Sequence, residues 1–141
     1  MAAGEPFTRE QHERIERARR GAEADTGIRF WLRLGELAMD PRLEAEHLLA
    51  NLVTTPHEEG VLILVAPGAR RVEIMTTQSA KRRVTDQAAG LAVLAMTSSF
   101  AVGDLVGGLV VAFRQLAGAA GRPAGSDTVV SQAAQLESSA H

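Results

Sequence analysis

Lys81, Arg82 and Arg83 form the longest run of basic residues in the chain, and they stand just before a predicted helix. The free N–H groups of a helix start attract anions, so cations beside such a start favour phosphate binding. We treat these three residues as a candidate anion-binding site, with a solvated basic loop as the alternative interpretation. The sequence contains no Gly-x-x-x-x-Gly-Lys-Ser/Thr segment, which excludes a P-loop.

The side chains that could act as nucleophiles have no histidine near them in the sequence that could serve as a general base. Thr76, Thr77 and Ser79 offer hydroxyl groups after a predicted strand, but no histidine stands near them in the sequence. The four histidines follow no metal-binding spacing, and no Gly-x-Ser-x-Gly segment is present. Because the chain has no cysteine, thiol catalysis, disulfides and thiolate zinc sites are excluded. We assign no catalytic residue.

The composition is that of one globular domain of 141 residues. A net charge of −2 does not favour nucleic acid as a partner. The first residues lack a basic segment followed by an apolar one, so we expect a cytoplasmic protein. The uncharged stretch 87–103, continued by 105–113, is long enough to cross a bilayer, but Asp104 interrupts it. We therefore expect two buried helices and no membrane span.

Local signals divide the first half of the chain into a helix, a strand and a second helix. Thr8 and Gln11 have capping-box spacing and predict a helix that ends near Asp25. Residues 28–34 alternate apolar and polar side chains, as in a strand with one buried face. Asp40 followed by Pro41 predicts the start of a second helix, which ends before residues 55–56.

The second half predicts two strands and two helices. Residues 61–66 are all apolar, as in a central strand, and residues 71–75 alternate as a returning strand. Helices are predicted at 87–98 and 104–117, with a break at 100–103. We expect an α/β fold of order α-β-α-β-β-α-α, in which helices flank a small mixed sheet. Residues 1–5 and 121–141 are predicted to be disordered around a domain at 6–120.

Several segments, in this order, resemble the TPM domain, a family that includes a thylakoid acid phosphatase, a receptor modulator and bacterial envelope proteins. The segments are Thr8–Ile28, Glu59–Pro67, Arg71–Ile74, Val84–Asp86 and Phe100–Leu109. The resemblance covers roughly residues 6–118 and is closest to a short, uncharacterised actinobacterial branch. It implies the TPM fold, which agrees with the predicted order of elements.

The resemblance also aligns three acidic residues, Glu58, Asp86 and Asp104, with acidic positions of the family. Carboxylate oxygens are the ligands that hard cations prefer, so these residues are candidate ligands for Ca²⁺ or Mg²⁺. The alternatives are a helix cap or helix-dipole charge at Asp86 and Asp104, and an exposed loop residue at Glu58.

The chain departs from the family at two functional segments. Glu58-Glu59-Gly60 replaces Asp-Asn-Gly, and residues 76–83 replace a glycine-rich segment. We therefore expect this chain to have the TPM fold, but not the phosphatase activity or the receptor partners of that family. We expect a non-enzymatic binding or regulatory module with a protein partner, in an oligomeric state that the sequence leaves open. The alternative is a phosphatase-like hydrolase that depends on a divalent cation.

Overall fold

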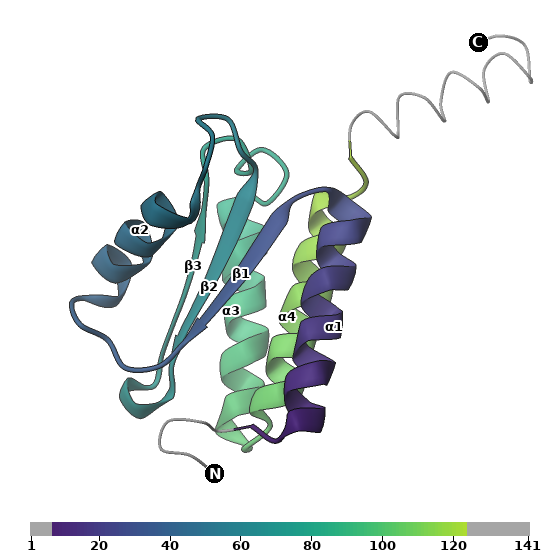
Figure 1. The fold of residues 1–141 in the computed structure, drawn as a ribbon. Coiled ribbons are helices and arrows are strands. Elements are labelled where there is room, and N and C mark those ends of the chain that lie inside the picture. The colour runs from purple at the N-terminus through teal and green to yellow at the C-terminus, as the bar shows by residue number, and fades with distance from the viewer. Residues whose placement is uncertain (1–6, 124–141) are drawn as a thin grey trace, which may run out of the picture.

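The computed structural model describes residues 7–123 and contains four α-helices, one 3-10 turn and three strands in that range (Figure 1). The predicted disordered segment 1–5, and residues 124–141 of the predicted tail, lie outside the described residues. In chain order the elements are α1 (Arg9–Thr26), β1 (Arg29–Leu34), α2 (Pro41–Leu52), β2 (Gly60–Ala66), η1 (Pro67–Ala69), β3 (Arg71–Thr76), α3 (Asp86–Ala101) and α4 (Leu105–Ala120).

The three strands form one mixed sheet of order β1-β2-β3. β1 runs parallel to β2, to which it is joined through α2, and β3 pairs antiparallel with β2 after the turn η1. This arrangement confirms the predicted fold class and the predicted order of elements. None of the helices in the described range 7–123 is both long and apolar enough to span a membrane.

The sheet lies between two layers of helices, with α2 on one face and α1, α3 and α4 on the other (Figure 1). Because side chains alternate along β2, Val61, Ile63 and Val65 pack against the three-helix layer. Leu62 and Leu64 pack with α2 on the opposite face. The all-apolar composition of this strand thus reflects burial on both faces, as the sequence predicted.

The helix ends follow local signals with small differences. Thr8 and Gln11 form the predicted capping box, and Gly27 ends α1 with a positive φ of 77°. α3 continues through Ala101, three residues beyond the predicted end at 98. Its last turn is retained because Phe100 packs against Gly108 of α4, where a Cβ atom would lie only 2.7 Å from the Phe100 ring. The predicted break at 100–103 is therefore wrong for Phe100 and Ala101, which belong to α3 because helix packing extends its end.

Candidate functional site

Glu58 precedes β2 and is engaged within the protein. Its carboxylate accepts hydrogen bonds from the backbone N–H and the hydroxyl of Thr54, at 2.8 and 3.0 Å. The Arg29 guanidinium lies 3.1 Å away and belongs to β1. The Glu58 side chain is only 10% exposed. The Thr54 backbone N–H, followed by the Thr54 hydroxyl and Arg29, lowers the Glu58 pKa below its ordinary value of 4.5, although burial opposes the shift. Glu58 thus fastens the α2–β2 loop to β1.

Arg83 connects three elements that are distant in the sequence. Its guanidinium pairs with Glu59 at 2.9 Å and donates to the carbonyl of Thr26, the last residue of α1, at 2.8 Å. It also donates to the carbonyls of Gly121 and Arg122, just after α4, at 2.8 and 2.9 Å. The last carbonyls of a helix lack intrahelical partners and carry partial negative charge, so a cation stabilises them.

The basic run 81–83 therefore divides into residues with different surroundings. Arg83 binds protein oxygens and its side chain is only 17% exposed. Lys81 lies 3.7 Å from the carboxylate of Asp86 in an exposed ion pair. Arg82 is exposed. Thr85, rather than Asp86, caps α3 by accepting the Ala88 N–H, and Asp86 is the first helical residue.

Asp104 lies at the other end of α3 and caps α4. Its carboxylate accepts the N–H of Gly107 at 2.9 Å, as the capping alternative predicted. α3 has 16 residues, which corresponds to roughly 24 Å at ~1.5 Å per residue, so Asp86 and Asp104 lie far apart. Within residues 7–123, no three acidic or histidine side chains gather as metal ligands would. The structure does not bring Glu58, Asp86 and Asp104 together.

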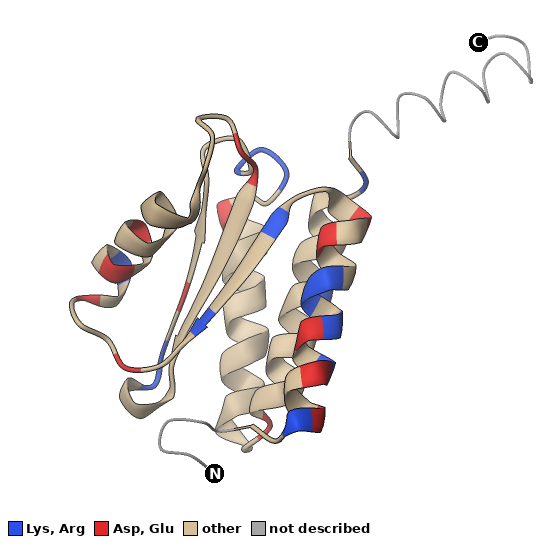
Figure 2. Ribbon diagram, viewed as in Figure 1, with Lys and Arg blue, Asp and Glu red and all other residues tan. Residues whose placement is uncertain are grey.

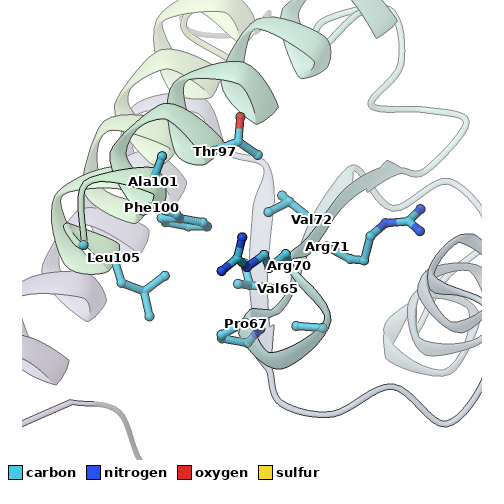
Figure 3. Close-up of a pocket in the computed structure, with 11 residues that line it drawn as sticks. Val65, Pro67, Arg70, Arg71, Val72, Thr97, Phe100, Ala101 and Leu105 are labelled. Atoms are coloured by element: carbon cyan, nitrogen blue, oxygen red, sulfur yellow. The ribbon is translucent and has the colours of Figure 1, made fainter.

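A cleft of about 450 Å³ lies at the Asp104 end of the molecule, between the β2–β3 turn and the α3–α4 connection (Figure 3). We call it the Arg70 cleft. Arg70 is the only residue other than glycine with a positive φ in the described range, at 55°. The lining residues are Val65, Ala66, Pro67, Arg70, Arg71, Val72, Thr97, Phe100, Ala101, Gly103 and Leu105.

Sequence reasoning did not identify this cleft. The turn at Pro67-Gly68 is recognisable from its residues. The direction of the Arg70 side chain depends on the left-handed backbone at Arg70, which no local pattern indicates. Phe100 falls in the predicted helix break and Leu105 at the start of the last predicted helix, and their common wall forms only when α3 and α4 pack.

Charged residues are distributed unevenly among the helices. Figure 2 shows acidic and basic residues along α1, whereas α3 carries no charge after Asp86. Leu91 and Leu94 are 58% and 62% exposed on α3. Exposed residues recur there at helical spacing, and we call this set the α3 outer surface: Gln87, Gly90, Leu91, Leu94, Thr97, Ser98 and Ala101.

Two solved structures share this fold. The BA42 protein from the psychrophilic bacterium Bizionia argentinensis has a TM-score of 0.71 and 25% identity, over 82% of each chain. The N-terminal domain of the cg2496 protein from Corynebacterium glutamicum has a TM-score of 0.65 over 82% of this chain and 74% of that one. At 15% identity the second match shows the fold alone.

Relatives in sequence come from Mycobacterium tuberculosis. The uncharacterized proteins Rv2468c, from strain H37Rv, and MT2543, from strain CDC 1551, are each 36% identical over 89 residues. The aligned part is 63% of this chain and 52% of each relative, so the chain spans about half of their length. A family model described as a domain of unknown function, DUF5130, matches residues 1–117. Neither this description nor the names of the relatives mentions the TPM domain. The match covers most of the chain, which therefore belongs to the DUF5130 family.

Proposed function

We propose that this chain is a TPM-like, actinobacterial, non-enzymatic binding module, and that its protein partner docks on the α3 outer surface. The observation that carries the proposal is the exposure of Leu91 and Leu94 on a helix without charge between Asp86 and Asp104. Isolated exposed leucines are common, but the centres of protein interfaces are depleted of charged residues, as this helix face is.

Two of the candidate site residues, Glu58 and Arg83, are bound by other groups of the protein, which also supports a non-enzymatic role. Glu58 is bound by Thr54 and Arg29, and Arg83 is bound by Glu59 and helix-end carbonyls. A catalytic acid or base must instead reach the substrate proton directly or through one water. These contacts give Glu58 and Arg83 clear structural roles.

Site-specific photo-crosslinking tests the docking surface. A photoreactive amino acid is placed at position 91 or 94 in cells of the native host, and at position 17 on the charged, exposed face of α1 as a matched control. We expect positions 91 and 94 to capture the same protein and position 17 not to capture it. The substitution Leu94→Glu should weaken that complex at least tenfold, because a carboxylate would be desolvated at the contact. Equal capture from all three positions would refute the assigned surface.

The hydrolase alternative is tested on the purified chain with a phosphomonoester substrate, in calcium or magnesium and then in chelator. The binding-module proposal expects no cation-dependent turnover. Turnover that requires the cation and is lost in Asp86→Asn would overturn the proposal in favour of a metal-dependent phosphatase.

A further inference from the structure

The Arg70 cleft has apolar walls around a single inward-pointing cation. Val65 and Val72 come from the sheet, whereas Phe100 and Leu105 come from the α3–α4 side. Figure 3 shows the Arg70 side chain directed toward Phe100, while Arg71 extends away from the cleft. Binding sites for small molecules commonly combine mostly apolar walls with a few polar groups, in volumes of ~300–1,000 Å³. The volume of about 450 Å³ falls in this range.

The two neighbouring arginines differ in charge partners. Arg71 lies 3.9 Å from the carboxylate of Glu73, which also lies 3.8 Å from Arg42. In the described range, no carboxylate pairs with the Arg70 guanidinium. Asp104, which stands between the lining residues Gly103 and Leu105, does not line the cleft and caps α4 through the Gly107 N–H. The positive charge of the Arg70 guanidinium is therefore not neutralised by a carboxylate of the described residues, and its N–H donors lie at the apolar cleft.

The backbone at Arg70 adds a second observation. A left-handed conformation is unfavourable for a residue with a Cβ atom, whereas glycine adopts it freely. The side chain at this position is nevertheless a long cation that reaches into the cleft. Strained residues that persist in folded proteins concentrate at ligand sites. The conformation directs the guanidinium to the same space that the apolar walls enclose.

We propose that the Arg70 cleft binds a small anion carried on an apolar group, such as an aliphatic or aromatic carboxylate. The guanidinium binds the carboxylate, for which its paired N–H donors are suited. The apolar part of the ligand lies against Phe100 and Leu105, where its burial supplies most of the affinity. The cleft and the α3 outer surface share Thr97 and Ala101. This inference does not rest on the proposed function, because Leu91 and Leu94, which carry the docking proposal, do not line the cleft.

Calorimetric titration of the full chain with octanoate, octanol and acetate separates the contributions of the two parts of the ligand. We expect octanoate to bind about tenfold more tightly than octanol, since a charge-assisted pair contributes roughly that factor. Acetate should show no measurable binding because it lacks the apolar part. Equal affinities for octanoate and octanol, or no binding of octanoate at millimolar concentration, would overturn the proposal.

Three variants assign the binding to the cleft. Arg70→Gln should weaken octanoate about tenfold and leave octanol unchanged, whereas Leu105→Ala should weaken both ligands. The control Arg114→Gln removes the same charge from an exposed residue of α4 that does not line the cleft, and its octanoate affinity should stay within about twofold of the unmodified chain. If Arg114→Gln weakens octanoate as much as Arg70→Gln does, the effect is long-range attraction and the assigned site is wrong. Circular dichroism verifies that each variant is folded.

Discussion

Replacing Arg83 by Met removes the guanidinium that joins the end of α1, the α2–β2 loop and the end of α4, while keeping an apolar stem of similar length. The largest loss concerns the carbonyl of Thr26, a residue that is fully buried. A buried acceptor left without a partner costs ~1–3 kcal/mol. The Glu59 pair is partly exposed and contributes up to about 1 kcal/mol. The carbonyls of Gly121 and Arg122 belong to exposed residues, where water can replace the guanidinium. We expect a total loss of about 1–4 kcal/mol.

Urea unfolding followed by circular dichroism measures this loss, with the slope of the transition reporting any change in the unfolded state. Arg82→Met is the matched control, because Arg82 is the preceding residue and is exposed, and its stability should change by less than about 0.5 kcal/mol. Arg83→Lys should recover only part of the loss, since an ammonium cannot donate to several separated oxygens as a planar guanidinium does. The reasoning is refuted if Arg83→Met and Arg82→Met are equally stable.

Three further predictions concern the core, a cap and the pH response. Leu64→Ala should lower the free energy of unfolding by ~2–5 kcal/mol in urea titrations, because Leu64 is buried under α2; a loss below about 1 kcal/mol would contradict that packing. Asp104→Ala should cost ~0.5–2 kcal/mol and Asp104→Ser almost nothing, with or without calcium; a calcium-dependent rise in the melting temperature that Asp104→Asn abolishes would favour a metal ligand instead. The lowered pKa of Glu58 stabilises the fold above the ordinary value of 4.5, and this contribution disappears as the pH falls through the lower folded value. The gap in melting temperature between the unmodified chain and Glu58→Gln should therefore be widest near neutral pH and close in acid; a constant gap would show that Glu58 acts through packing alone.

The order of elements could be predicted from the sequence because each signal is local. The capping box of Thr8 and Gln11 lies within one helical turn, and Pro41 directly follows its cap. The all-apolar segment 61–66 already indicated a strand covered on both faces. The cap at Asp104 also depends only on a residue three positions later, Gly107, and it was among the predicted alternatives.

Long-range geometry decided the roles of the charged residues. Arg70 and Arg83 each stand beside another arginine, so their surroundings could not be distinguished by local pattern. Arg83 reaches a carbonyl 57 residues earlier and another 38 residues later, and these meet only when α1 and α4 end at the same side of the sheet. Asp86 and Asp104, by contrast, are separated by the length of α3. Pairwise contacts between distant elements, which no local pattern encodes, determine which charges are neutralised inside the fold and leave Arg70 at an apolar cleft.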